Sequence, residues 1–573
     1  MPLEKKWILK PEKNPQAIEH LMKELNVEYL IAKLLVDRGI ETFDQAKDFF
    51  RPNLNQLHDP YLMRNMQSAV DRINLAIENG EGILIYGDYD VDGTTSVALM
   101  YSFLKQRYPH LETYIPDRYK EGYGVSFAGI DFAAEQGLSL IIALDCGIKA
   151  IDKVQYAKEK GIDFIICDHH RPGDKVPNAV AVLDPKQEDC QYPYDELSGC
   201  GVGFKLCQAL AQNWKWSEDS WLSTLDLLAL SIGADIVPIT GENRILAFHG
   251  LKKINKDPRP GMKAMIETAK KSGNLTITDV VFTIGPRVNA AGRMDHGHKA
   301  VELLCTENYD DALKLAENIE VNNRDRRAVE ADILDAAVKQ LDTPEEQKRK
   351  STVIYNPEWN KGVIGIVASK LIEKHYYRPT VVFTKSGDKL AASARSVMGF
   401  DIYQALDKCS DVLEQFGGHM YAAGMTLKEE RFEEFKEKFE QVVSESITED
   451  QLKPFIEVDA EVRLEDITDK TFRILSQFEP FGPQNLQPIF AAKCLRDNGS
   501  GRQIGADKSH LKLCLRDADG SKTFDTIAFG FGELWTDLAG KEVHACFHID
   551  ENIWNGRRSL QLRALDIKQA ILA

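Results

Sequence analysis

Apolar runs of strand length alternate with helical segments between residues 80 and 240. The apolar runs are residues 82–88, 138–145, 163–168 and 179–184. Segments 94–106 and 149–161 have the length and apolar spacing of helices, and Gly161 provides a stop signal. Strands that alternate with helices in this way form a mainly parallel sheet covered on both faces. The pattern therefore predicts an α/β domain.

The rest of the chain carries three further patterns. A charged segment at 306–342, almost free of glycine and proline, predicts one long helix between two lobes, with its charges on a solvated face. A second α/β pattern begins at residue 351 and includes the glycine-rich segment 415–425. After about residue 454, alternating β segments predict a small β-barrel, with an Asn-Gly turn at 555–556.

The predicted fold class is α/β with an added β-barrel. A chain of 573 residues is too long for one hydrophobic core, so several domains are expected. The predicted domains are a helical lead-in (1–50), a parallel-sheet domain (51–300), a connecting helix (301–345), a second α/β domain (346–453) and a small β-barrel (454–573).

The composition is that of a globular protein, with 43% hydrophobic and 28% charged residues. No apolar run approaches the roughly 20 residues that span a bilayer, so we expect a cytoplasmic protein. The ten cysteines include no C-x-x-C pair, which disfavours structural zinc and disulfides. The net charge of −17 argues only weakly against a nucleic-acid partner, because binding needs a local basic groove.

Aspartate follows or ends each of the first three predicted strands, as Asp88, Asp145 and Asp168. Asp90 and Asp92 come directly after Asp88, in the segment DYDVDG. The carboxyl ends of parallel strands form a ligand-binding edge, so these carboxylates are expected to converge and to need cations. Helix caps and a solvent-facing turn are the simpler alternatives. A calcium loop is excluded, because the twelfth residue counted from Asp88 is leucine.

Two adjacent histidines, His169 and His170, follow Asp168 in the segment FIICDHHRPGD. Neighbours on an extended chain point to opposite sides, so at most one imidazole can be a packed core group. Asp235 interrupts another apolar run, and a buried carboxylate needs a strong partner. Mixed oxygen and imidazole ligands suit manganese, magnesium or iron better than zinc.

Several of these segments together resemble a known superfamily. YGDYDVDGTTS, ALDCGI, CDHHRPGD and GADIVP are similar to the four ordered motifs of the DHH phosphoesterases. WNKGVIGIVASK, SARS and FGGHMYAAGM resemble the DHH-associated domain. From about residue 50 onward the chain resembles the RecJ branch, through IPDRYKEGYG, IGPRVNAAGRMDHG and a barrel introduced by FEPFGPQNLQPIF. This resemblance implies that residues 51–300 form the catalytic domain and that the barrel (454–573) is of the oligonucleotide-binding type.

The resemblance implies a binuclear site for two divalent cations, with Mn²⁺ preferred or Mg²⁺ in its place. The implied metal ligands are Asp90, Asp92, Asp145, His169 and Asp235, with Asp145 as a bridge. Asp88 and His170 are implied as catalytic residues, either as ligands or as nearby support. His170 could donate to the scissile phosphate or merely orient Asp168. Tyr86 stands where related pyrophosphatases carry histidine, which favours the RecJ branch.

The implied activity is hydrolysis of single-stranded DNA from 5′ to 3′ into mononucleotides, in DNA repair and recombination. The residues expected to contact DNA or its phosphates are Arg118, Tyr123, Arg287, Asn289, Ser393, Arg395, Gly418 and His419. Arg395 offers paired hydrogen bonds to a terminal phosphate, and the turn at Gly418 offers backbone N–H groups. Alternatively, Arg395 pairs with a carboxylate and the glycines only turn the chain.

Two other functions compete with this one. The first is hydrolysis of short oligonucleotides or cyclic dinucleotides, which has no use for a strand-tracking barrel. The second is a non-catalytic DNA-binding scaffold, which has no use for so much clustered negative charge. We expect a monomer that binds single-stranded DNA and no membrane, with a single-strand-binding protein or a helicase as candidate partners. Which of Phe529, Phe531 and Trp554 stacks on bases is left open.

Overall fold

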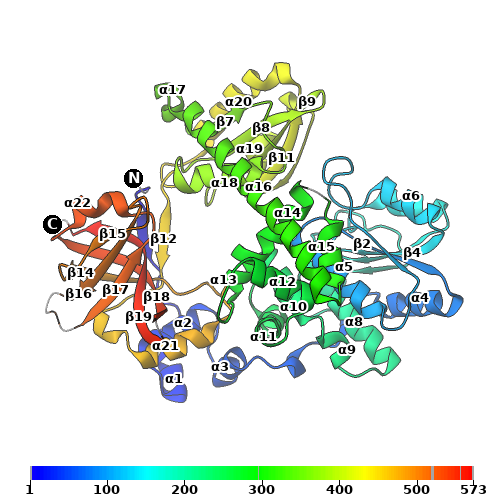
Figure 1. The fold of residues 1–573 in the computed structure, drawn as a ribbon, viewed down its shortest axis with the longest axis horizontal. Helices are drawn as coiled ribbons and strands as arrows, with labels where there is room; N and C mark the ends of the chain where they lie inside the picture. Colours follow the sequence, from blue (N-terminus) through cyan, green and yellow to red (C-terminus); the bar gives the residue numbers. More distant parts are fainter. Residues whose placement is uncertain (1–2, 295, 518–519, 521, 555, 571–573) are drawn as a thin grey trace. The chain divides into compact units, whose positions relative to one another are not determined.

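The computed structural model describes residues 3–294, 296–517, 520, 522–554 and 556–570, apart from the side chain of Trp554. The chain forms two compact units (Figure 1). Unit 1 comprises residues 1–46, 327–477 and 487–573, and unit 2 comprises residues 47–326 and 478–486. Among the described residues, no helix is both long and apolar enough to cross a membrane.

Unit 2 is built on a five-stranded parallel sheet in the order β3-β2-β4-β5-β6. Its strands are β2 (Gly82–Gly87), β3 (Leu111–Tyr114), β4 (Leu138–Leu144), β5 (Asp163–Cys167) and β6 (Ala181–Leu183). The four strands predicted from apolar runs are confirmed. The prediction missed β3, whose sequence LETY is mostly half-exposed at the sheet edge and forms no apolar run.

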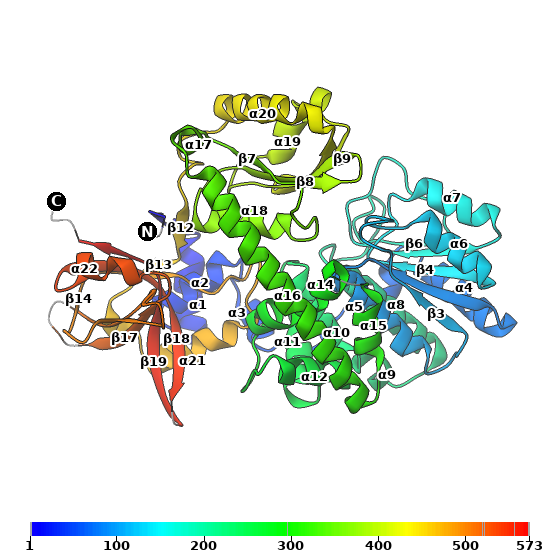
Figure 2. The ribbon, with the colours of Figure 1, turned by 45° about the horizontal axis from the view of Figure 1, so that its top comes forward.

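Helices cover both faces of this sheet. Alternate strand residues such as Ile83 and Ile142 enter a core shared with α4 (Met66–Asn79), α5 (Val91–Leu104), α8 (Gly199–Trp214) and α10 (Leu225–Ala234). Their neighbours Leu84 and Ile141 enter the opposite core, under α6 (Phe127–Glu135) and α7 (Ile151–Glu159) (Figure 2). Period-two alternation therefore supplies two buried faces, as the predicted doubly covered sheet requires.

The long helix predicted at 306–342 is confirmed as α16 (Tyr309–Leu341). Ala312, Ala316 and Ile319 join the core of unit 2. Ile333, Ala337 and Leu341 join a core of unit 1. The two halves of one helix thus contribute to different hydrophobic cores.

The second α/β domain lies in unit 1 and has a mixed sheet in the order β10-β11-β9-β8-β7. Its elements include β7 (Thr352–Tyr355), α18 (Ile364–Lys374), β8 (Thr380–Ser386), β9 (Lys389–Arg395), β10 (Gln415–His419), β11 (Ala422–Leu427) and α20 (Phe432–Ser446). Only β7 and β8 are parallel. The glycine-rich segment is therefore an antiparallel hairpin, whereas the sequence predicted a turn around Gly418.

The C-terminal barrel is a seven-stranded sheet in the order β13-β14-β18-β19-β17-β16-β15, and an added β14–β16 pairing closes it. The longer strands are β14 (Phe490–Asp497), β16 (His510–Arg516), β17 (Thr523–Ala528), β18 (Glu542–Trp554) and β19 (Arg557–Gln569). The predicted barrel is thus confirmed, while the Asn-Gly turn at Asn555 lies outside the described residues. The lead-in begins with a strand, β1 (Lys6–Leu9), parallel to β12 (Phe455–Val458), before its helices. The sequence predicted only helices there.

Candidate active site

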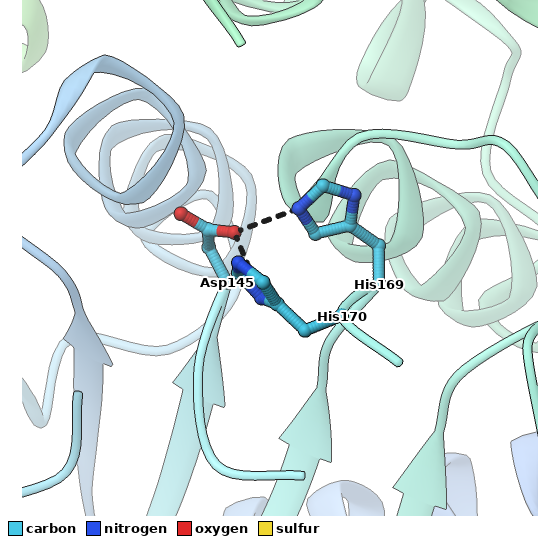
Figure 3. Close-up of side chains that lie close together, drawn as sticks. All are labelled: Asp145, His169 and His170. Carbon is cyan, nitrogen blue, oxygen red and sulfur yellow. Dashed lines mark ion pairs between the residues drawn. The ribbon is translucent and has the colours of Figure 1, made fainter. Parts of the chain in front are cut away.

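Three neighbouring strands of unit 2 end in polar residues at the same edge. Asp88 follows β2, Asp145 follows β4, and Asp168, His169 and His170 follow β5. Because β2, β4 and β5 are adjacent and parallel, these side chains converge. Asp145 takes a left-handed backbone conformation with φ 58°, in which aspartate is one of the few tolerated residues. Figure 3 shows both histidines directed at its carboxylate.

The imidazole ring of His169 lies among three carboxylates. Its Nε2 atom is 3.2 Å from Asp145 Oδ1, 3.5 Å from Asp235 Oδ2 and 3.8 Å from Asp92 Oδ2. Both ring nitrogens and Asp145 Oδ1 are buried, and none has a hydrogen-bond partner within the part of the chain that the structure describes. Buried polar groups are normally paired, so these atoms fit the ligand set of a metal ion. Among the described residues, two groups of side chains lie close enough together to hold one: Asp145, His169 and His170, and Asp92, His169 and Asp235.

Asp92 is oriented by the N-terminus of α8. Its oxygens accept hydrogen bonds from Gly199 N at 2.7 Å, Cys200 N at 2.9 Å and Ser231 Oγ at 2.6 Å. A Cβ atom at Gly199 would lie 2.6 Å from Asp145 Oδ1, so only glycine fits beside the site. Sequence reasoning missed these positions. The segment SGCG at the start of an apolar helical run was the available signal.

The other predicted acidic residues belong to the same edge. Asp90 caps α5, where its Oδ1 accepts a hydrogen bond from Gly93 N at 3.0 Å. Asp88 is fully buried, and its Oδ2 has no hydrogen-bond partner. Asp235 comes from a helix rather than a strand, because it follows the last residue of α10. All five predicted metal ligands therefore lie around one edge of the sheet.

The pKa values of these groups are shifted because several carboxylates are buried close together. Burial raises the pKa of Asp145 and Asp235 well above the usual range, and the neighbouring carboxylates raise it further. Burial and the charge of Asp90 likewise raise the pKa of Asp88. Burial lowers the pKa of His169, which favours the neutral imidazole that binds metals. Carboxylate oxygens and a neutral imidazole suit Mn²⁺ or Mg²⁺.

His170 is held beside this cluster by Asp168. His170 Nδ1 is 2.8 Å from Asp168 Oδ1, and its Nε2 is 3.4 Å from the Tyr123 hydroxyl. Burial lowers the pKa of His170, but the hydrogen bond and charge of Asp168 outweigh this and raise it to about 9. Asp168 also accepts from the backbone N–H of Ile148, which fixes the carboxylate. The imidazole therefore has a set orientation and a favoured positive charge.

A cavity of about 300 Å³ lies over the acidic cluster. Its lining includes Tyr89, Asp90, Asp92, Arg118, Tyr123, Asp235, Asn289 and Arg293. Arg118, Tyr123 and Asn289, which the sequence predicted as DNA contacts, thus line this cavity. Arg118 packs over the Tyr89 ring at 3.9 Å and donates to Gly292 O at 3.2 Å, so its guanidinium has a fixed position.

Arg287 does not line this cavity, contrary to the expected phosphate contact. It is buried, with its Nε 2.6 Å from Glu320 Oε2 and its Nη1 2.6 Å from Thr283 O. Arg293 lines the cavity instead. It lies four residues after Asn289 on α14 (Gly285–Met294), so the two share a helix face. That spacing was the signal in the sequence.

Tyr86 supports the loop that carries Tyr123. Its buried hydroxyl donates to Gly124 O at 2.9 Å and accepts from Ser126 N at 3.1 Å. Its ring stacks on Tyr114 at 5.3 Å. The residue that departs from the related pyrophosphatases is therefore a structural anchor for one wall of the cavity.

A second candidate site lies in unit 1, around Arg395 at the end of β9. Arg395 Nη1 donates to Ser393 Oγ at 2.9 Å and to Ala394 O at 2.7 Å. Within the described residues no carboxylate pairs with Arg395, so the structure offers no support for the alternative of a structural ion pair. Burial lowers the pKa of its guanidinium. A Cβ atom at Gly365 would lie 2.8 Å from Ser393 Oγ, so the first turn of α18 adjoins this pair.

The predicted residues Gly418 and His419 have different relations to Arg395. His419 pairs with Ala422, which pairs with Arg395, so the three lie in one row on one sheet face. Gly418 lies on the other face. A Cβ atom there would be 2.3 Å from Ala422 O, so this glycine permits close strand approach. The expected anion-binding turn at Gly418 is therefore replaced by packing of the hairpin.

Three protein families match successive parts of the chain. The DHH family N-terminal domain matches residues 82–232, the DHHA1 domain matches 349–445, and the RecJ OB domain matches 458–566. The metal ligands, the Arg395 site and the barrel each fall close to or inside one of these matches.

Curated relatives and solved structures agree with these matches. The single-stranded-DNA-specific exonuclease RecJ of Bacillus subtilis is 37% identical over 556 residues, which cover 96% of this chain and 69% of that protein. The Escherichia coli protein of the same name is 32% identical, with 93% and 94% covered. A crystal structure of RecJ with Mn²⁺ from Thermus thermophilus superposes with a TM-score of 0.84 at 26% identity, covering 99% of this chain and 80% of that one.

Proposed function

The chain belongs to the RecJ family of single-stranded-DNA-specific exonucleases, and on this premise we propose that it is a divalent-metal-dependent exonuclease that degrades single-stranded DNA in repair and recombination. The observation that carries the proposal is His169, whose buried ring nitrogens lie among three carboxylates and accept or donate no hydrogen bond within the described chain. Crystal structures of RecJ from Thermus thermophilus in complex with Mn²⁺ and with Mg²⁺ support the choice of metal.

The residues that would hold the cations are Asp90, Asp92, Asp145, His169 and Asp235. Asp145 is the proposed bridge between two ions, because its Oδ1 atom lies within 3.9 Å of both histidines and has no hydrogen-bond partner among the described residues. Bound divalent ions would supply an activated water and would neutralise charge on the phosphate. Asp88 is proposed to support the cluster from its buried position behind Asp90.

The chain's own side chains would position the scissile phosphate. Arg118 and Arg293 bring positive charge to a cleft that is otherwise acidic, and Asn289 adds an amide donor. Guanidinium groups can make paired hydrogen bonds to phosphate oxygens. His170, fixed by Asp168 and favoured as a cation, would donate a hydrogen bond where negative charge develops. That role needs the same ring orientation that Asp168 imposes.

The 5′ to 3′ polarity is proposed to come from the Arg395 site. A terminal phosphate carries more charge and one more free oxygen than an internal phosphate. Arg395 has no carboxylate partner within the described chain, Ser393 adds a hydroxyl, and α18 adds the partial positive charge of a helix N-terminus. Ser393, Arg395 and His419 are thus the proposed end-binding residues.

The barrel is proposed to bind the strand away from its end. Phe529 is 54% exposed and packs its ring against His510, whereas Phe531 is buried, so Phe529 is the proposed stacking platform. Arg502, Lys512 and Arg563 lie in one cross-strand row on the same sheet. Exposed aromatics beside cationic side chains are the usual means of binding single strands.

The experiment is a nuclease assay of the purified chain with Mn²⁺ on end-labelled strands. We expect mononucleotides to be released from the 5′ end of single strands and chelator to abolish the release. Absence of cleavage with every divalent metal would support a DNA-binding scaffold instead. Cleavage confined to dinucleotides or cyclic dinucleotides would support a small-substrate hydrolase.

A further inference from the structure

A second cavity, of about 320 Å³, lies beside the candidate metal centre and has no role in the function proposed above. Val125, Cys146, Ile148 and Ala150 give it a largely apolar lining. All the residues of its lining belong to unit 2. A cavity of this kind at the edge of a parallel sheet is a usual place for a small organic group.

The cavity is connected to the metal centre through two shared side chains. Tyr123 lines both this cavity and the cleft over Asp90 and Asp92. His170 also lines the cavity, and its Nδ1 atom is 3.9 Å from Asp145 Oδ1. A phosphate bound at the candidate metal centre would therefore have one neighbouring nucleoside within reach of the cavity.

Lys149 places a positive charge at the cavity, and no described residue neutralises it. Its side chain is exposed, and it forms no hydrogen bond or ion pair with any described residue. The other lysine of the lining, Lys153, already pairs with Asp152 at 2.9 Å and lies over the Phe127 ring. A free ammonium beside an apolar hollow suits a ligand with an apolar body and an adjacent anionic group.

We propose that this cavity receives the sugar and base of one nucleotide flanking the bond to be cleaved, while Lys149 binds the adjacent phosphate. The volume lies near the lower end of the roughly 300–1,000 Å³ typical of small-molecule sites, which suits one nucleoside rather than two. An apolar lining accepts every base, as a nuclease without sequence preference requires. The inference rests on the proposed exonuclease activity.

The first test uses strands that carry a single abasic position at each of the first four nucleotides. We expect wild-type digestion to slow about tenfold when the missing base is the one that should occupy the cavity, because one base contact is then lost. The position of that slow step shows whether the base belongs to the departing nucleotide or to the next one. Uniform rates at all four positions would overturn the proposal.

The second test fills the cavity with Ala150→Phe. This variant should slow digestion of an intact strand. On the strand whose abasic position leaves the cavity empty, wild type is already slow, and the variant should slow digestion little further. Non-additivity of this kind marks two changes that act on one contact. Purely additive losses would show that the cavity holds no base. If wild type digests no single strand at all, the exonuclease proposal itself fails, which is a different outcome.

The third test removes the charge with Lys149→Ala, and uses Lys158→Ala on the exposed side of α7 as the matched control. We expect the KM of Lys149→Ala for long strands to rise about five- to tenfold with kcat little changed. The slope of log affinity against log salt should fall by about 0.7, the value for one phosphate contact on a single strand. Identical KM and salt slope in the two variants would contradict the assignment.

Discussion

Two α/β domains of this chain have opposite chemistry at comparable places. In unit 2, parallel strands β2, β4 and β5 end in carboxylates and imidazoles, and burial and the neighbouring carboxylates raise the pKa of Asp145. In the second α/β domain, strand β9 ends in Arg395, which has a serine and a backbone carbonyl as partners and no carboxylate within the described residues. One strand end gathers acidic groups, whereas the other presents a guanidinium that no described carboxylate neutralises.

The difference follows from what surrounds each strand end. Asp92 is oriented by the N–H groups of α8, so this helix N-terminus holds a carboxylate in place. The N-terminus of α18 adjoins Arg395 and Ser393 instead, so helix and guanidinium both favour the same anion. A phosphodiester substrate with a charged end needs both kinds of site.

The largest effect should come from disrupting the cation-binding site around Asp145. Asp145→Ala removes the proposed bridging ligand, so activity with Mn²⁺ should fall at least about 10³-fold, equivalent to about 4 kcal/mol in the transition state. The fold should persist, because the lost group is a buried carboxylate with a raised pKa. Circular dichroism provides the control. More than a few per cent of residual activity in a folded variant would refute the ligand role.

The next largest effect should come from the proposed anion-binding site around Arg395. Arg395→Ala should reduce the rate on 5′-phosphorylated strands about 10- to 100-fold, because hydrogen bonds to charged groups contribute about 1.5–3 kcal/mol. The rate on 5′-hydroxyl strands should change little. Arg431→Ala, an arginine of the same domain that pairs with Glu434, serves as the matched control. Equal losses on the two substrates would separate Arg395 from end recognition.

A smaller effect is expected in the barrel. Phe529→Ala should weaken binding to long single strands about fivefold, through loss of one base contact, and should leave cleavage of very short oligonucleotides nearly unchanged. Phe43→Ala is the control, since Phe43 is 45% exposed on a helix far along the chain from the barrel. Removal of residues 455–573 should give a stronger form of the same length dependence. Loss of activity on all lengths alike would refute the accessory role.

The smallest effect concerns stability without metal. Asp235→Asn removes one of the mutually repelling carboxylates, so the metal-free variant should melt about 2 °C higher than wild type. Added Mn²⁺ should raise the melting temperature of wild type more than that of the variant. Differential scanning fluorimetry with and without chelator measures both. An unchanged response to Mn²⁺ would place Asp235 outside the metal site.

The sequence predicted the elements whose signals are local. The apolar runs of β2, β4 and β5 and the charged period of α16 located those elements within a few residues. Edge strand β3 was missed because an exposed strand carries no apolar run. Gly418 was misread as a turn because glycine also serves close strand approach, which depends on a partner strand.

The same limit to local signals explains which residues of the candidate site could be predicted from the sequence. Asp90, Asp92 and Asp145 were found because carboxylates at strand ends are unusual as a group. Contacts across the fold gave no such signal: the bond of Ser231 to Asp92 joins residues 139 positions apart, and the pairing of Arg287 with Glu320 joins two helices. Residue type indicated charge at these positions, but only packing decided which charges were already neutralised.

The most direct test of the cation-binding site is calorimetric titration of the metal-free chain with Mn²⁺, in wild type and in Asp145→Asn. The substitution keeps the shape of the side chain and removes its charge, so misfolding does not confuse the result. We predict two bound ions per wild-type chain, and at least a tenfold weaker affinity in the variant because the proposed bridge contacts both ions. Equal stoichiometry and affinity in the two proteins would contradict a metal centre at Asp145.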